Sequence, residues 1–411
     1  MKATDVFTPQ RMPTVTLVSS HLDRMAEEYK GVMEEGGKLV RVVGPSKSGK
    51  TVFIKSSVGN DIVPVAGGGV GSPEQLWIRV LHSIGSDVAI ENERVEARGG
   101  GFKASGEVEG NVFIAKGTVA GEVSRDKSFQ ASVTQTKAMD ALQQVIKELG
   151  GTGLTVFVDD FHYIPATVQV ELAQQIKQAV ENGVRVAAAA VPFRSEDALR
   201  ANDDLQGRIR DFTFHYWNED ELVEIATLGF EKLNIRCPHA YASSLAKEAA
   251  GSPQLMQSLC LETCRELGIY ETSNSVVDVS GDPEFFRAVC QRVSASVDFS
   301  TTIKVMRDGP LTRGSARRTY VLKDGTAGDV YQIVLKAIAL DPPSLHFTYV
   351  DLQGRVASIC EGDSPHFSDP CFHISRLVND RYSSDKIDWD AEQHLFSIRD
   401  PYLIFGIRWG C

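Results

Sequence analysis

One stretch of the sequence has the residue types and spacing of a phosphate-binding loop. A glycine is followed five residues later by a second glycine and then directly by lysine and threonine, which is the pattern G-x-x-x-x-G-K-T. The residues of this loop are Gly44, Pro45, Ser46, Lys47, Ser48, Gly49, Lys50 and Thr51. Its glycines let backbone amides curl around phosphates, Lys50 neutralises the terminal phosphates, and Thr51 offers a hydroxyl to Mg²⁺. We therefore predict that the loop binds a nucleoside triphosphate with Mg²⁺.

Two carboxylates follow a second apolar segment. Residues 154–158 are nearly all apolar, as expected of a parallel strand covered on both faces, and Asp159 and Asp160 come directly after them. We predict that Asp159, at the carboxyl end of the strand, is the Mg²⁺ partner and that Asp160 is the catalytic base. The alternative is an acidic segment that only precedes the next helix.

Strands and helices alternate in the part of the chain that must position these residues. Strands are predicted at 38–44, 61–65, 154–158, 184–191 and 209–214, and helices at 50–57, from Ser72 and Pro73, and from Pro165 to Gly183. Such alternation specifies a parallel sheet with helices on both faces. Two strand-and-helix units separate the loop from Asp159, which favours the ATPase branch with an additional strand between the two motifs.

The rest of the chain suggests further domains. Residues 98–133 are a glycine-rich insertion, either a partner-binding arm or a segment without chemistry. Helices follow from the capping box at 218–221, and the order helix, helix, helix, hairpin near the end is typical of a winged helix. We predict an ATPase core at 1–217, a helical lid at 218–300, a basic linker at 301–325 and a winged-helix domain at 326–411.

Composition limits the classes of function. A chain of 411 residues suggests two or three domains, and its net charge of −11 argues against bulk binding to nucleic-acid phosphates. The seven cysteines lack paired C-x-x-C spacing, and we interpret them as buried apolar residues of a reducing compartment. No signal peptide or stretch of about 20 apolar residues is seen, so we expect a cytoplasmic protein without a membrane span.

The order of these motifs resembles that of the AAA+/STAND class of P-loop ATPases, in particular initiator-like prokaryotic members with a C-terminal winged helix. The resemblance rests on the loop, the Asp159-Asp160 strand, and residues 207–209, 217–222, 251–253 and 400–403. It implies an ATP and Mg²⁺ site, a lid over the nucleotide, and homo-oligomerisation in the ATP state. Many relatives that hydrolyse ATP have glutamate where this chain has Asp160, which is one methylene shorter, so we expect slow hydrolysis.

Two details bear on the branch of the class. The lid stretch 251–255 has no arginine, whereas initiator and clamp-loader ATPases carry one there that touches the γ-phosphate. It resembles the G-x-P motif of STAND switches, which implies that Pro253 lies on the adenine side of the nucleotide. Arg208 matches the position of an arginine finger that reaches a neighbouring subunit's ATP. The alternative is a surface arginine that pairs with Asp204 or Asp211.

The winged helix does not have the charge of a typical DNA reader. Its expected recognition helix, 372–381, has two arginines and one acid, and the wing contains Asp388, Asp390 and Glu392. We therefore favour an internal or protein-facing role. The basic segment is the remaining candidate for DNA contact, with a solvated linker as the alternative. Its cations are Arg313, Arg317, Arg318 and Lys323.

These features together predict a slow ATPase that works as a STAND-like switch. Its nucleotide state would control oligomerisation or binding to a separate effector or partner protein, as in prokaryotic signalling or defence systems. The alternative is an AAA+ ATPase that loads or remodels DNA in replication or transposition. A small-molecule kinase is disfavoured because it gives no reason for a winged helix.

Overall fold

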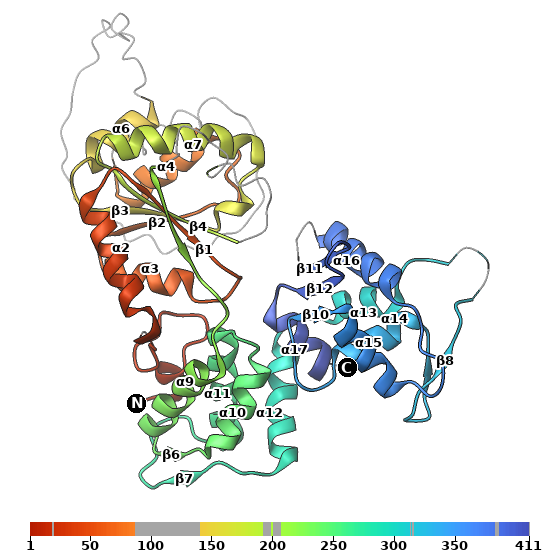
Figure 1. Cartoon of the computed structure of the whole chain (residues 1–411). Coiled ribbons are helices and arrows are strands. Elements are labelled where there is room, and N and C mark those ends of the chain that lie inside the picture. The colour runs from red at the N-terminus through yellow and green to blue at the C-terminus, as the bar shows by residue number, and fades with distance from the viewer. Residues whose placement is uncertain are drawn as a thin grey trace, which may run out of the picture.

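A computed structural model describes most of the chain (Figure 1). The described residues are 1–18, 20–86, 140–191, 199, 207–312, 314, 316–382 and 386–410. The glycine-rich insertion predicted at 98–133 lies outside them, as do Asp204 and Arg313. No helix of the described part is long and apolar enough to cross a membrane.

A five-stranded parallel sheet forms the centre of the first half. Its strands are β1 (Leu39–Val43), β2 (Ile62–Ala66), β3 (Thr155–Asp159), β4 (Arg185–Ala190) and β5 (Ile209–Thr213). They lie in the order β2-β3-β4-β1-β5, so that β4 separates the strand before the loop from the strand that ends in Asp159. The predicted fold class, with an additional strand between the two motifs, is confirmed.

Helices cover both faces of this sheet (Figure 1). Helices α2 (Asp23–Glu35) and α3 (Lys50–Val58) lie on one face, and α4 (Pro73–Ser83), α6 (Ala141–Leu149) and α7 (Ala166–Glu181) lie on the other. Successive residues of β4 alternate between the two cores: Ala187 packs in the α2–α3 cluster and Ala188 in the α4–α6–α7 cluster. The start of α4 is as predicted, because the Ser72 side chain caps it and Pro73 occupies its first turn.

The next unit is a helical lid. It contains α9 (Glu219–Lys232), α10 (His239–Glu248), α11 (Pro253–Glu266) and α12 (Pro283–Ser296), with the short strands β6 (Ile235–Arg236) and β7 (Val277–Asp278). The capping box predicted at Asn218 is present. Cys260, Cys264 and Cys290 are buried in the lid core, as predicted for apolar cysteines.

The N-terminal residues pack on the lid, although the sequence places them in the ATPase core. Helix α1 (Ala3–Val6) leads to Phe7, whose ring lies 5.2 Å from that of Phe230 of α9. A Cβ at Gly229 would lie 2.2 Å from the Phe7 ring, so only glycine leaves room for it. The chain then passes through a 3-10 turn, η1 (Ser20–Leu22), into α2.

The last unit is a C-terminal module, which we define as residues 300–410. It contains α13 (Ser300–Asp308), β8 (Tyr320–Val321), β9 (Ala327–Gly328), α14 (Val330–Ile338), β10 (His346–Thr348), α15 (Tyr349–Ile359), α16 (Ser368–Tyr382), β11 (Ile387–Asp390), β12 (Leu395–Ile398) and α17 (Pro401–Trp409). Strands β10, β12 and β11 form an antiparallel sheet beside α14, α15 and α16, which is the winged-helix order.

Two helices of this module differ from the sequence expectation. Helix α13 occupies part of the segment predicted as a linker, and its Ile303 and Met306 are buried in the core of the module. Helix α17, which follows the predicted hairpin, lies between the lid and the other elements of the module (Figure 1). Its Tyr402 and Phe405 belong to the lid core, whereas Leu403, Ile404 and Ile407 belong to the module core. A helix that is apolar all round is expected to be buried in this way.

Candidate nucleotide-binding site

The loop at 44–51 joins β1 to α3, as its pattern predicts. A Cβ at Gly44 would lie 2.4 Å from the Cβ of Phe214, so the chain can pass there only as glycine. Gly49 has φ +95°, a left-handed conformation that glycine adopts without strain, and it precedes the first turn of α3. The buried Ser48 hydroxyl donates to the Pro45 carbonyl at 2.9 Å and closes the loop on itself.

Lys50 lies over this loop. Its Nζ donates to the carbonyls of Gly44 at 2.8 Å and Pro45 at 2.6 Å. Burial lowers the pKa of Lys50 to about 8, and the nearby carboxylates of Asp159 and Asp160 oppose that shift. The ammonium group therefore lies where the loop and both acids converge, which is the place predicted for the terminal phosphates.

Asp159 and Thr51 form a pair of hard oxygen donors. The Thr51 hydroxyl donates to Asp159 Oδ2 at 2.8 Å, and the backbone N–H of Asp160 donates to Asp159 Oδ1 at 3.0 Å. Mg²⁺ prefers such oxygens, and it takes most of its other ligands from substrate phosphates and water. Among the described residues, no group of three or more His, Cys, Asp and Glu side chains is placed to hold a metal ion. Thr51 and Asp159 therefore fit a Mg²⁺ ion and would hold it, although their role as ligands stays a prediction.

Asp160 begins the 3-10 turn η2 (Phe161–Tyr163) in a left-handed conformation, with φ +53°. Burial and the neighbouring Asp159 raise its pKa, and Lys50 lowers it. Gly67, after β2, supports the acid pair: its N–H donates to the Asp159 carbonyl at 2.7 Å, and a Cβ there would lie 2.6 Å from the Asp160 carbonyl oxygen. Gly67 was not predicted as a site residue, and its only sequence signal is the Gly67-Gly68-Gly69 run that ends β2.

A cavity of about 430 Å³ adjoins the loop, Asp159 and Asp160. This volume is within the range of pockets that hold small ligands. Its remaining walls come from the N-terminal segment, η1, α2 and the lid, and they include Thr8, Thr16, Trp217, Pro253 and Gln257. Pro253 occupies the first turn of α11, and its predicted contact with the adenine side of a nucleotide stays a prediction.

Trp217 and Gln257 were not predicted as site residues. The Trp217 indole N–H donates to the Ser48 carbonyl at 3.0 Å, which connects the lid entry to the loop. Gln257 Oε1 accepts from the Thr8 N–H at 3.0 Å, and its Nε2 donates to Thr16 Oγ1 at 2.7 Å. These contacts join segments that are far apart in the chain, so no local pattern identifies them.

The lid motif Gly251-Ser252-Pro253 has a packing reason for its glycine. Gly251 has φ +80°, and a Cβ there would lie 2.5 Å from the Cβ of Tyr216. Its carbonyl accepts from the Trp217 N–H at 3.0 Å. The motif thus sets the distance between the lid and the Tyr216–Trp217 segment that touches the loop.

Solved structures with a similar fold resemble this chain over nearly its full length. A Walker-type ATPase of Pyrococcus abyssi has a TM-score of 0.51 at 14% identity, covering 94% of this chain and 95% of that one. The ORC2 protein of Aeropyrum pernix, solved in ADPNP–ADP complexes, has a TM-score of 0.50 at 12% identity, covering 98% and 96%. This chain has the AAA+ P-loop ATPase fold. No family model matches the sequence, and no curated protein does.

Arg208 lies away from the 44–51 loop of its own chain. It precedes β5 at the amino edge of the sheet, where its carbonyl accepts from the Leu39 N–H, and the loop leaves the opposite edge. Its side chain pairs with Glu181 at 3.1 Å, while Asp211 pairs with Arg41 at 2.7 Å. Under the alternative interpretation, a surface arginine, the partner is thus Glu181 and not Asp211. With 43% of its side chain exposed, Arg208 stays a predicted finger for a neighbouring subunit.

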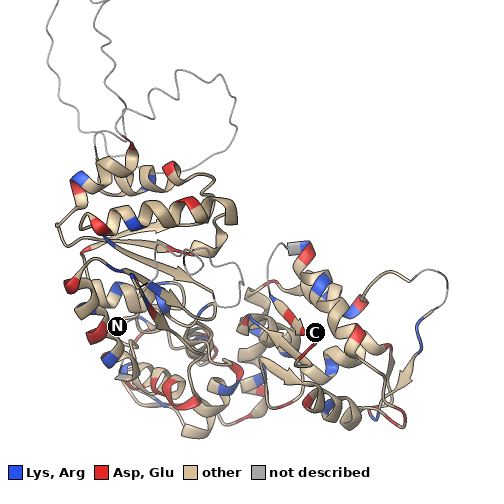
Figure 2. Ribbon diagram, turned by 45° about the horizontal axis from the view of Figure 1, so that its top comes forward, with Lys and Arg blue, Asp and Glu red and all other residues tan. Residues whose placement is uncertain are grey.

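The three described cations proposed for DNA contact have partners within the C-terminal module. Arg317 pairs with Asp329 at 2.8 Å, Arg318 with Asp363 at 3.4 Å, and Lys323 donates to the Ser358 carbonyl at 2.9 Å. The side chain of Arg376 on α16 lies 4.0 Å from Asp380, and Arg399 pairs with Asp388 at 2.9 Å. Figure 2 shows basic and acidic residues interspersed on the ribbon of this module.

Proposed function

We propose that this protein binds ATP at the 44–51 loop and hydrolyses it in a Mg²⁺-dependent reaction. The observation that carries the proposal is the convergence of Lys50, the Thr51–Asp159 pair and Asp160 on one cavity. Lys50 and the loop amides bind the β- and γ-phosphates and stabilise the charge that develops on them. Mg²⁺, when bound, neutralises phosphate charge. Asp160 orients the attacking water and accepts its proton, a role that its raised pKa favours.

The cavity also supports a mode of binding for the base and sugar. Its outer wall combines the N-terminal segment with the lid, so a nucleotide held by the loop contacts both. The buried Thr8 hydroxyl lies in this wall and has no hydrogen-bond partner among the described residues, so a polar edge of the base would satisfy it. A ligand that touches two units shifts the equilibrium between their arrangements, and this makes the lid position depend on the nucleotide.

The second candidate function is that of an initiator-like ATPase that loads or remodels DNA. The likeness to the ORC2 protein over nearly the whole chain favours it over a STAND-like switch. The paired cations of the C-terminal module favour a small DNA contact over a broad one. We expect DNA binding that needs ATP and weakens as salt rises. Fluorescence anisotropy with duplex and single-stranded DNA at two salt concentrations measures this, and no binding at low salt with ATP would eliminate the candidate.

Replacing Asp160 with asparagine tests the proposed hydrolysis. The amide keeps the shape of the side chain but cannot accept a proton, so we expect kcat to fall about 100-fold. ATP binding should be retained or become tighter, because a negative charge near the phosphates is removed. Phosphate release reports the rate, and a fluorescent ATP analogue reports binding.

Two controls define the result. Asp61→Asn removes an exposed carboxylate before β2 and should leave both readouts unchanged. In the parent protein, EDTA should stop phosphate release. Hydrolysis by Asp160→Asn at the parent rate would refute its role as base, and a parent protein that releases no phosphate with Mg²⁺ would refute the proposed function.

A further inference from the structure

Lys47, the fourth residue of the loop, has an unusual backbone conformation. Its φ is +63°, in the left-handed region that glycine adopts without strain and that lysine rarely occupies. Residues held in such conformations persist where the surroundings fix them, and they cluster at functional sites. Lysine occupies this position in spite of the strain, and its side chain makes contacts that glycine could not make.

That side chain contacts the C-terminal module. Lys47 Nζ lies 2.9 Å from Asp400 Oδ1 and 3.2 Å from Oδ2, and 4.1 Å from the centre of the Tyr402 ring. Both partners belong to the start of α17, where Asp400 also caps the helix by accepting from the Tyr402 N–H at 3.0 Å. Only 27% of the Lys47 side chain and 16% of the Asp400 side chain is exposed. Little water surrounds these two charges, so their attraction is screened less than that of a surface ion pair and is stronger.

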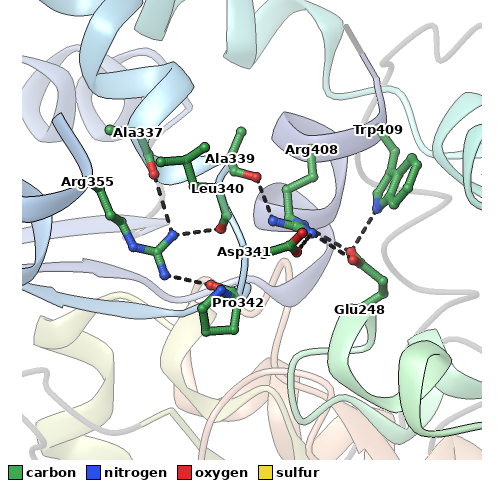
Figure 3. A network of polar contacts seen from close by, with 9 residues as sticks. All are labelled: Glu248, Ala337, Ala339, Leu340, Asp341, Pro342, Arg355, Arg408 and Trp409. Atoms are coloured by element: carbon green, nitrogen blue, oxygen red, sulfur yellow. Dashed lines mark hydrogen bonds and ion pairs between the residues drawn. The ribbon is translucent and has the colours of Figure 1, made fainter. Parts of the chain in front are cut away.

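The Asp400 end of this contact is held in place. The Tyr216 hydroxyl donates to the Arg399 carbonyl at 3.0 Å, and the Tyr402 hydroxyl lies 3.3 Å from Ser258 Oγ in the lid. At the other end of α17, Arg408 and Trp409 bind Glu248 of α10 (Figure 3). Because α17 is fixed at both ends, the flexible Lys47 side chain is the part of this contact that can move most easily.

Lys47 also belongs to the nucleotide site. It lines the same cavity as Lys50 and Thr51, and its backbone N–H is part of the loop that curls around phosphate. Its ammonium group therefore has two anions within its reach when ATP is bound, the phosphates and the Asp400 carboxylate. Both form charge-assisted hydrogen bonds with ammonium, so the two anions compete for one cation.

We propose that Lys47 and Asp400 form a latch between the nucleotide loop and the C-terminal module, which bound phosphates open by competing for Lys47. This inference rests on the proposed ATP binding. By linkage, a change at Asp400 that weakens the pair and leaves Lys47 in place strengthens ATP binding, and ATP binding weakens the docking of α17 on the loop by the same factor. Binding of the nucleotide thus changes how firmly the C-terminal module is docked on the loop.

Asp400→Asn in the full-length protein tests the latch. Asparagine caps a helix as well as aspartate does, so α17 keeps its start while the charge that competes with phosphate is lost. We expect the Kd for ATP, measured by calorimetry, to fall about three- to tenfold. Asp363→Asn removes an equal charge from an exposed pair of the same module and should leave the Kd unchanged.

Lys47→Gly completes a double-mutant cycle. Glycine relieves the left-handed backbone conformation, so this variant should fold well while it lacks the ammonium group. In the Lys47→Gly background, Asp400→Asn should no longer change the Kd. Hydrogen exchange of residues 402–404 is the second readout, because the first turn of α17 adjoins the latch while its far end stays held by Glu248. It should become faster in the parent protein when a non-hydrolysable ATP analogue binds, and should already be fast in Asp400→Asn.

The outcomes separate the latch from the proposed function. An unchanged Kd in Asp400→Asn, or an equal change in the presence and absence of Lys47, would overturn the latch even though the parent protein binds ATP. A parent protein that binds no ATP would instead refute the proposed function. Exchange of residues 402–404 that does not change when the nucleotide analogue binds would also overturn the latch.

Discussion

Replacing Lys50 with alanine is expected to lower kcat/KM for ATP by about 10³- to 10⁵-fold. Part of the loss is in binding, because a charge-assisted hydrogen bond to phosphate is worth about 1.5–3 kcal/mol. A further factor of about 10²–10³ is lost in turnover, since a preorganised donor to the developing charge is removed.

Steady-state phosphate release and calorimetric titration with ATP measure the two parts separately. Lys30→Ala removes an exposed lysine from α2 and should behave as the parent protein in both assays. The fold should be unaffected by Lys50→Ala, because the partners of Lys50 are loop carbonyls that water can also satisfy. Binding of ATP to Lys50→Ala with the parent Kd would show that the nucleotide binds elsewhere.

The sequence predicted the parts of the fold that depend on neighbouring residues. The apolar strands, Ser72 and Pro73 at the start of α4, and the Asn218 capping box all appear where they were expected. These signals are local, because a cap or a buried strand acts within a few residues. Helix α17 has such a signal too, with Asp400 as its cap and Pro401 in its first turn. However, apolar and polar residues do not alternate along α17 with the helical period, because the helix is buried from two sides.

Helix α13 shows how composition can mislead. Its sequence, with Lys304 and Arg307, belongs to a basic stretch that continues through Gly309 and Pro310, and the stretch as a whole looks like a linker. The helix ends at Asp308, before these breakers, and buries Ile303 and Met306 on one face. Residues 300–308 by themselves have the spacing of an amphipathic helix, which the irregular segment after them does not share.

The candidate site divides in the same way. The loop and the Asp159–Asp160 pair are contiguous motifs, so the sequence shows them directly. Gly67, Trp217 and Gln257 join the site only through tertiary packing, and Asp400 reaches Lys47 from a position 353 residues further along the chain. A residue pattern within one element cannot reveal such contacts, because the partner residue lies in a distant part of the chain.

Helix α17 connects the 44–51 loop, the lid and the rest of the C-terminal module. Its first turn touches Lys47, one face lies in the lid core, another lies in the module core, and its last turn binds α10. A movement of the lid on nucleotide binding would therefore be passed to the module through α17, with the junction at α10 as one route. The strength of that junction can be tested by itself.

Replacing Arg408 with methionine is expected to weaken this junction by about 3–5 kcal/mol. Arg408 Nε and Nη2 donate to the two carboxylate oxygens of Glu248 at 3.0 and 2.7 Å, and Trp409 Nε1 donates to Glu248 Oε2 at 2.7 Å (Figure 3). Only 6% of the Arg408 side chain and 7% of the Glu248 side chain is exposed. The single substitution leaves the buried Glu248 carboxylate without its cation, which costs far more than the pair itself contributes.

Native-state hydrogen exchange of α10 and α17 measures this loss locally, which matters because a chain of several units need not unfold in one step. Exchange in both helices should become at least 100-fold faster. Replacing Glu248 as well, with Met at both positions, should restore most of the protection, because no buried charge is then left unpaired. Arg236→Met, in an ion pair that is 70% and 66% exposed, should change exchange little. If Arg408→Met and Arg236→Met exchange alike, the Glu248 junction adds little to the attachment of α17, and the two apolar cores do most to hold the lid and the C-terminal module together.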